Sequence, residues 1–184
     1  GLAFAQAFGE EAEITATIIC GDSFFNENLE EAKASILAMV KEQNPDVFIA
    51  GPAFNAGRYG VACGTVCEMV KEELGIPVVT GMYEENPGAD MFKNKVYTVA
   101  TKNSAAGMRA AVKSMAPLAL KLAKGEKIGA SCEEGPVPTY GVYTPDNTLN
   151  IEGEVTSEDG LTQEVYSECS TEYSVDVKLQ LKKK

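Results

Sequence analysis

The feature that most constrains the fold is an alternation of short apolar runs with amphipathic stretches along residues 13–124. Four runs have the composition of strands, at residues 13–20, 47–50, 76–80 and 96–100. Between these runs, apolar residues recur three and four positions apart, as they do on the buried face of a helix. A β-α-β-α order is typical of a parallel sheet covered by helices. The sequence therefore predicts an α/β fold with a parallel sheet of about four strands and flanking helices.

Residues with known roles at helix ends support this division. Asn28 is followed three residues later by Glu31, as in a capping box, and Asn44 precedes a proline that stops the helix. Helices are expected over 29–43, over 58–74 before a C-terminal glycine, and from about 104 to 124. Pro117 is expected to kink or divide the last of these helices.

The pattern changes after the α/β region. Residues 129–146 are rich in glycine and proline and form a predicted linker between an α/β domain at 1–128 and a tail at 147–184. Apolar residues in the tail alternate with polar ones, which predicts a small antiparallel β C-terminal extension of about three strands. So small a sheet cannot bury its apolar face alone, so it is expected to pack on its own domain or on another copy. We expect a homo-oligomer.

Composition narrows the possible chemistry. The sequence contains no histidine, which excludes histidine general bases, Ser-His-Asp triads and histidine-containing metal sites, and no metal centre is expected. The net charge of −11 disfavours binding to nucleic acid. No apolar run is long enough to span a membrane. Five cysteines without CxxC spacing suit a reducing, cytoplasmic location, although the sequence begins at Gly1 and a removed signal stays open.

Candidate ligand-binding residues cluster in the loops that follow the second and third predicted strands. Ligands of parallel α/β sheets bind at the carboxyl ends of the strands. In the loop 51–60, Arg58 is suited to clamp a carboxylate, and Asn55 or Tyr59 to orient it. The alternative is a glycine-rich turn in which Arg58 pairs with a surface acid.

The loop 81–90 adds two further candidates at the same edge. Tyr83 is expected to line the crevice, and Glu84 to bind an ammonium group or act as a general base. Solvated loop charges are the alternative for this pair.

Cys63 is the one weak candidate for a catalytic residue. It lies near the predicted start of the helix 58–74, and a helix N-terminus lowers the pKa of a thiol, so Cys63 is expected to alkylate fastest. Cys67 lies four residues further on the same helical face. The alternative is that both are buried structural cysteines.

A long continuous stretch of the chain resembles a known family. Residues 46–109 read DVFIAGPAFNAGRYGVACGTVCEMVKEELGIPVVTGMYEENPGADMFKNKVYTVATKNSAAGMR, and the similarity extends from about Glu11 to Pro138. This stretch closely resembles the component B selenoproteins of glycine, sarcosine and betaine reductases. The resemblance implies a reductase complex that acts on a small amino acid or amine. It also implies a partner subunit whose pyruvoyl group holds the substrate.

The chain also departs from that family. The family's selenocysteine lies in a downstream U-x-x-C-x-x-C segment that has no counterpart here, and Cys63 and Cys67 do not match it. No cofactor is therefore evident in this chain, and any reductase function is not autonomous. Two hypotheses follow. The first is a reductase subunit or fragment with a crevice for a small amino acid or amine. The second is a non-catalytic binding or self-assembling protein that associates through its tail.

Overall fold

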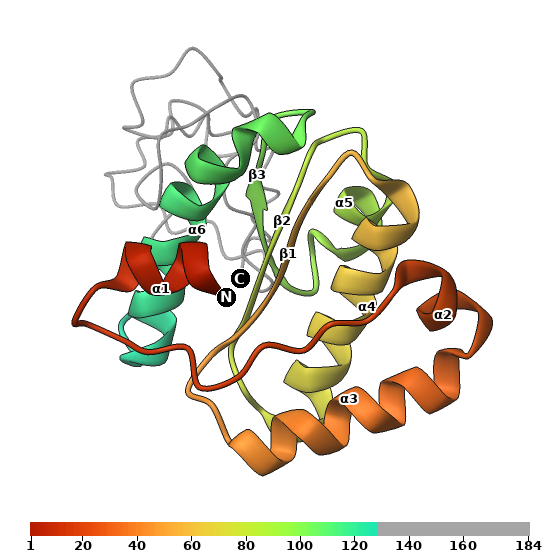
Figure 1. Cartoon of the computed structure of the whole chain (residues 1–184), viewed down its shortest axis with the longest axis horizontal. Helices are drawn as coiled ribbons and strands as arrows, with labels where there is room; N and C mark the ends of the chain where they lie inside the picture. Colours follow the sequence, from red (N-terminus) through yellow and green to blue (C-terminus); the bar gives the residue numbers. More distant parts are fainter. Residues whose placement is uncertain (129–184) are drawn as a thin grey trace, which may run out of the picture. The chain divides into compact units, whose positions relative to one another are not determined.

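Three parallel strands form the centre of the fold, in the order β1-β2-β3 (Figure 1). The computed structural model describes residues 1–128. Phe48 of β1 pairs with Val78 of β2, and Val79 of β2 pairs with Tyr97 of β3. The elements follow one another as α1 (Leu2–Phe8), α2 (Asp22–Glu27), α3 (Leu29–Gln43), β1 (Phe48–Phe54), α4 (Gly57–Leu74), β2 (Val78–Met82), α5 (Pro87–Phe92), β3 (Tyr97–Ala100), the 3-10 turn η1 (Ala105–Gly107) and α6 (Met108–Ala123). The predicted α/β class and the parallel sheet are confirmed.

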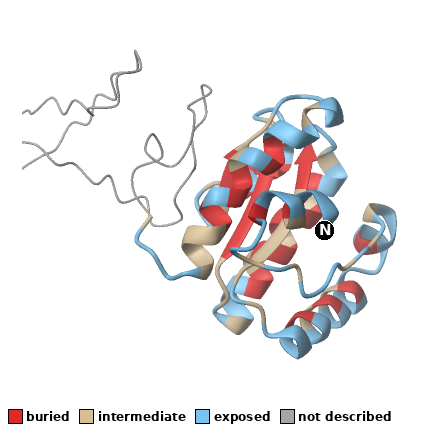
Figure 2. Cartoon of the chain, turned by 60° about the vertical axis from the view of Figure 1, so that its left-hand side comes forward, coloured by how far each residue is buried: buried red, intermediate tan, exposed pale blue. Residues whose placement is uncertain are grey.

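Helices cover both faces of the sheet and bury its apolar side chains (Figures 1 and 2). On one face, α1 and α6 enclose a core that includes Met115 and Leu118, both fully buried. On the other face, α3 and α4 pack a second core around Cys67 and Val70. All five residues of β2 are buried, as expected of the middle strand of a parallel sheet.

The C-terminal ends of α3 and α4 follow the end signals of the sequence, but the expected capping box at Asn28 does not form, because its side-chain amide donates to a carbonyl oxygen of α2 and makes no cap hydrogen bond. Helix α3 covers 29–43 as predicted and ends at Asn44, which has the left-handed backbone conformation with φ 44°. Helix α4 ends at Leu74 before Gly75, whose φ is 66°. Helix α6 runs unbroken through Pro117, so that proline does not divide it.

The first of the four predicted strands is wrong. Residues 13–20 form no strand, and no backbone hydrogen bond joins them to β1 anywhere in the described residues. Residues 12–20, called the strap below, instead cross in front of β1 on their way from α1 to α2 (Figure 1). Alternating apolar residues favour a strand only where a neighbouring backbone lies about 4.8 Å away, and here a cavity separates the strap from β1.

Two further findings concern residues 1–128 alone. None of the helices there has the length and apolar character needed to cross a membrane. In the same residues, no group of three or more Cys, Asp or Glu side chains is placed to hold a metal ion. The predicted linker and the predicted antiparallel tail lie outside the described residues, so those predictions and the expected oligomer stay untested.

Candidate functional site

The first turns of α4 place a phenol and a thiol at the carboxyl end of β1. Tyr59 and Cys63 lie four residues apart, hence on one face of the helix, and they form a side-chain hydrogen bond. Burial raises the pKa of Cys63 to about 12 and is also the main cause that raises the pKa of Tyr59 to about 12. Both groups are therefore neutral at neutral pH. The expected lowering of the Cys63 pKa is wrong, because burial outweighs the helix N-terminus.

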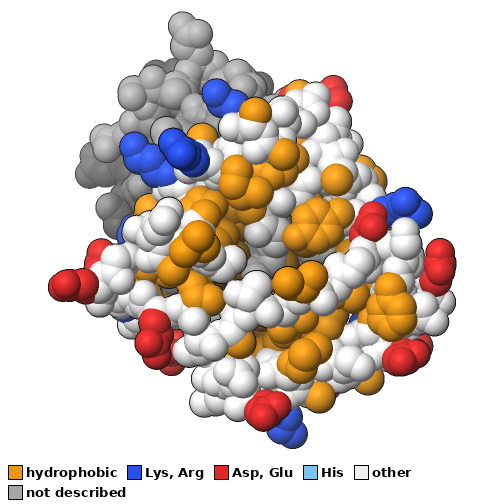
Figure 3. All heavy atoms as spheres, viewed as in Figure 1, with side chains coloured by type: hydrophobic (Ala, Val, Ile, Leu, Met, Phe, Trp, Pro, Cys, Tyr) orange, Lys and Arg blue, Asp and Glu red, His pale blue; other side chains and the backbone are white. Residues whose placement is uncertain are grey.

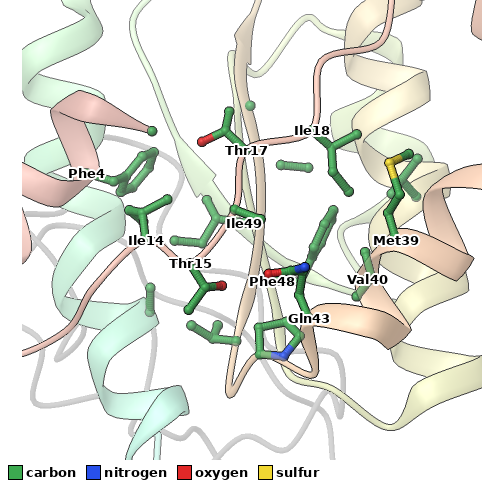
Figure 4. A pocket seen from close by; sticks show the side chains of 18 of the residues that line it. Phe4, Ile14, Thr15, Thr17, Ile18, Met39, Val40, Gln43, Phe48 and Ile49 are labelled. Carbon is green, nitrogen blue, oxygen red and sulfur yellow. The ribbon is translucent and has the colours of Figure 1, made fainter.

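This pair lies at the margin of a cavity in residues 1–128. The edge cavity, as we call it, has a volume of about 860 Å³ and separates the strap from β1, with α3 and α6 at its sides (Figure 4). Tyr59, Cys63, Cys20 and Asp22 belong to its lining. The edge cavity therefore borders β1 as far as Gly51 and the first turns of α4, and of the residues predicted to line a ligand crevice it includes Tyr59 and Cys63.

Arg58 lies beside this region and forms an ion pair with an acid at the start of α2. Its Nε is 3.7 Å from Oδ2 of Asp22; the side chain of Arg58 is 69% exposed and that of Asp22 39%. The surface-acid alternative is thus observed. Asp22 nevertheless begins the helix that directly follows the strap, so Arg58 lies beside the segment 21–28 at the sheet edge. At 3.7 Å the pair is longer than a charge-assisted hydrogen bond of about 2.8 Å, so a ligand carboxylate can compete with Asp22.

The other predicted residues lie apart from the edge cavity. Asn55 is exposed in the loop before α4. Tyr83 and Glu84 interact with each other, and their hydrogen bond raises the pKa of Tyr83. Glu84 lines a different cavity of about 130 Å³, beside Lys93 and Ala100. The structure thus brings Tyr59 and Cys63 together at the edge cavity and places Arg58 beside Asp22. Glu84 lines the second cavity instead.

Sequence reasoning missed Asn86, which ties two loops of the site together. Its side chain is 1% exposed; the amide nitrogen donates to the carbonyl oxygens of Phe54 (2.9 Å) and Ala56 (3.2 Å). Its amide oxygen accepts from the backbone nitrogen of Gly88 at 2.9 Å and caps α5. The signal was present in the sequence, because asparagine before proline is a common start of a helix.

Asn86 also explains Gly60, one of the glycines of the loop 51–60. A Cβ at Gly60 would overlap the side-chain amide of Asn86, so Gly60 lets α4 approach the loop that carries it. Gly51 has a different role, because its φ of 92° is a conformation that other residues rarely adopt. The glycines of this loop therefore serve packing and backbone geometry.

The three cysteines of the described residues are free thiols of unequal access, which gives a direct prediction. Cys20 is partly exposed, whereas Cys63 and Cys67 are buried. Because alkylation requires an accessible thiolate, Cys20 is expected to react with N-ethylmaleimide at pH 8 at least tenfold faster than the other two. Peptide mapping by mass spectrometry over a time course measures this order. Labelling of Cys63 before Cys20 would contradict it and restore Cys63 as a reactive thiol.

Comparison with known proteins places this α/β region in a family. The family described as glycine/sarcosine/betaine reductase selenoprotein B matches residues 1–144. The chain belongs to this family. A glycine reductase complex component B subunit gamma of Peptoclostridium litorale is 63% identical over 130 residues, which are 71% of this chain and 30% of that relative. The corresponding subunit of Carboxydothermus hydrogenoformans is 60% identical over 135 residues, 73% of this chain and 31% of that relative.

The match to the selenoprotein B family covers more than one type of reductase. A sarcosine reductase complex component B subunit beta of Peptoclostridium acidaminophilum is 54% identical over 135 residues, 73% of this chain and 31% of that relative. The chain spans about 30% of the length of these curated relatives. No solved structure matches the chain.

Proposed function

We propose that this chain is part of a component B subunit of a glycine, sarcosine or betaine reductase-type complex, and that its α/β region binds the carboxylate of a small amino acid. The observation that carries the proposal is 50–63% identity to subunits named for all three reductases, across one and the same α/β region. The described residues are assigned to binding, and the redox chemistry to other polypeptide segments.

The three substrate names indicate which group a shared region would recognise. Glycine, sarcosine and betaine differ in the methylation of nitrogen and have the carboxymethyl group in common. A region that is similar in all three types of reductase is therefore suited to bind the carboxylate that their substrates share. Arginine presents a planar fork that matches a carboxylate with two parallel hydrogen bonds. Arg58, next to the edge cavity, supports this assignment because its observed ion pair uses only Nε.

The two thiols of α4, Cys63 and Cys67, do not fit the role of a selenol. Cys63 has a pKa of about 12 and Cys67 is fully buried with a pKa raised well above its usual value, so neither supplies a nucleophilic thiolate at neutral pH. The selenocysteine and the partner's pyruvoyl group implied by the family would supply reduction and substrate attachment. In this proposal Tyr59 and Cys63 act as neutral groups that form part of the pocket wall.

Replacement of Arg58 tests the proposed function. Arg58→Ala is expected to weaken glycine binding by about 1.5–3 kcal/mol, roughly 10- to 150-fold, because a charge-assisted contact is lost. Arg58→Lys keeps the charge without the fork and is expected to recover part of the affinity. Isothermal titration of the full chain with glycine, sarcosine, betaine and trimethylamine measures the effect; trimethylamine lacks the carboxylate and is expected not to compete.

The matched control is Arg109→Ala, at the only other arginine of the sequence. Arg109 lies in the first turn of α6 on the opposite face of the sheet, and its replacement is expected to leave glycine binding unchanged. Equal affinity of Arg58→Ala and the parent protein would overturn the assignment of Arg58. Competition by trimethylamine as strong as that by betaine would overturn recognition of the carboxylate.

A further inference from the structure

Asp22 lies where the edge cavity meets Arg58. It is the first residue of α2, directly after the strap, and it belongs to the lining of the cavity. Arg58 does not belong to that lining, but it reaches Asp22 from the first turn of α4, where its Nε is 3.7 Å from Oδ2 of Asp22. The ion pair therefore joins a cationic group outside the cavity to an anionic group at its wall.

The ion pair between these two side chains is weakly held. Within residues 1–128, Arg58 is the only basic side chain that pairs with the carboxylate of Asp22, and Arg58 itself is 69% exposed. Ion pairs with so much exposure contribute little to stability. Arg58 can therefore turn to the carboxylate of a ligand at small cost. Asp22 would then be left at the cavity wall without a basic partner.

The other charged side chains of the edge cavity favour a cation at this wall. Four acidic side chains line the cavity, those of Glu11, Glu13, Asp22 and Asp46, whereas Lys124 is the only basic side chain among the described residues that line it. Lys124 is already paired with Glu11 at 2.8 Å. A ligand that binds Arg58 through its anionic end is therefore expected to turn its cationic end toward the cavity.

We propose that Asp22 makes the site at Arg58 specific for zwitterions, by holding the positively charged nitrogen of the substrate while Arg58 holds the carboxylate. This role of Asp22 rests on the proposed function, because it requires a ligand carboxylate at Arg58. A simple carboxylate would separate Arg58 from Asp22 and leave Asp22 without a basic partner. A zwitterion replaces one loose ion pair by two, because each member of the pair receives a new partner of opposite charge.

The same arrangement suits a nitrogen with or without methyl groups. Glycine, sarcosine and betaine all carry a positive charge on nitrogen, and a carboxylate attracts that charge even where no N–H donor remains. Methyl groups directed into the edge cavity would meet apolar lining side chains, among them Phe25 and Ala62, and the aromatic ring of Tyr59. Aromatic rings attract quaternary ammonium groups. Figure 3 shows apolar side chains gathered across this face, with charged side chains toward its rim.

The alternative is that Asp22 only positions Arg58. In that case, removal of the Asp22 carboxylate would weaken the binding of every carboxylate ligand by a similar factor. If Asp22 holds the nitrogen, its removal weakens only the ligands that carry a cationic nitrogen. A ligand with a carboxylate alone would bind at least as well as before, because Arg58 has lost its competitor. A comparison of glycine with acetate therefore separates the two roles.

Chemical-shift titration of the full chain with glycine, betaine and acetate tests the role of Asp22. The parent protein is expected to bind glycine at least about tenfold more tightly than acetate, which lacks the nitrogen. Asp22→Asn removes the charge and keeps the size of the side chain. It is expected to weaken the binding of glycine and betaine at least about tenfold, and to bind acetate as tightly as the parent protein or more tightly.

The matched control is Glu27→Gln, which removes one carboxylate at the other end of α2, outside the cavity lining. It is expected to leave all three affinities unchanged. Unchanged glycine binding by Asp22→Asn, or an equal loss of glycine and acetate binding, would overturn the role of Asp22 while the loss caused by Arg58→Ala still upheld the proposed function. Unchanged glycine binding by Arg58→Ala, or no glycine binding by the parent protein, would overturn the proposed function and the role of Asp22 together.

Discussion

Asn86→Ala is expected to lower the free energy of unfolding by about 2–4 kcal/mol, one of the two largest effects we predict. The replacement removes two donors from the buried carbonyl oxygens of Phe54 and Ala56 and one acceptor from the backbone of Gly88. Each buried polar group left without a partner costs about 1–3 kcal/mol. For a chain of this size the loss corresponds to a fall in Tm of roughly 5–15 °C, measurable by calorimetry.

Asn55→Ala is the matched control for this prediction. The replacement is chemically identical and lies in the same loop region, but Asn55 is exposed, so a change within about 0.5 kcal/mol is expected. Asn86→Asp provides a second comparison, because it preserves the side-chain size and the acceptor for Gly88 while removing both donors. It is expected to be at least as destabilising as Asn86→Ala near pH 7. Equal Tm values for Asn86→Ala and Asn55→Ala would contradict the role given to Asn86.

The elements that sequence predicted correctly are those whose formation depends on local signals and one buried face. Helix α3 illustrates this: Ala32, Ile36 and Val40 recur on one face and are all buried, and the helix ends at the expected asparagine. The middle strand β2 was equally clear, because its apolar run is buried on both faces. In these elements the pattern of the residues and their environment agree.

The first predicted strand, at residues 13–20, does not form, for a reason that the periodicity of the sequence cannot show. The alternation in residues 13–20 describes side chains suited to a strand, but a strand exists only when a second backbone lies beside it. The strap is separated from β1 by the edge cavity, and its apolar residues Ile14 and Ile18 pack on the two cores without pairing. The sequence pattern marks the strap as strand-like, and the tertiary structure decides that it is not a strand.

The candidate site shows the same difference between what the residue types indicate and what the fold decides. Residue chemistry drew attention to the loop 51–60 and to Cys63, and the structure places Tyr59 and Cys63 at the edge cavity but Arg58 beside Asp22. It did not reveal that Cys63 is buried, which reverses the direction of its pKa shift. Residue chemistry also did not identify Asn86. The stabilisation from its buried amide depends on three hydrogen-bond partners from two different loops. Burial and long-range hydrogen bonds are properties of the fold, not of local spacing.

Alkaline pH is expected to destabilise the protein, with Cys63 as one identifiable cause. The pKa of its thiol is about 12 in the folded protein, against an ordinary value of 9.0. Between these values the unfolded chain loses the thiol proton and the folded chain retains it, so stability is complete below pH 9 and falls as pH rises. One such group contributes about 1.4 kcal/mol per pH unit, on the order of 3 kcal/mol by pH 11.

Cys63→Ala isolates this contribution from that of the other alkaline groups. Tyr59 and Cys67 also have raised pKa values, and the charge of Cys63 is among the causes for both, so its removal is expected to make the decline of stability above pH 9 shallower. Urea unfolding of the parent protein and the variant at pH 8, 9, 10 and 11 measures the two slopes. Cys20→Ala is the control, because Cys20 is only partly buried and its replacement is expected to leave the slope unchanged. Parallel declines of Cys63→Ala and the parent protein would mean that the folded protein releases the Cys63 proton as readily as the unfolded chain does. Cys63 would then have to be reconsidered as an ionisable group of the site, because its thiol lowers the stability of the fold above pH 9 only if burial raises its pKa.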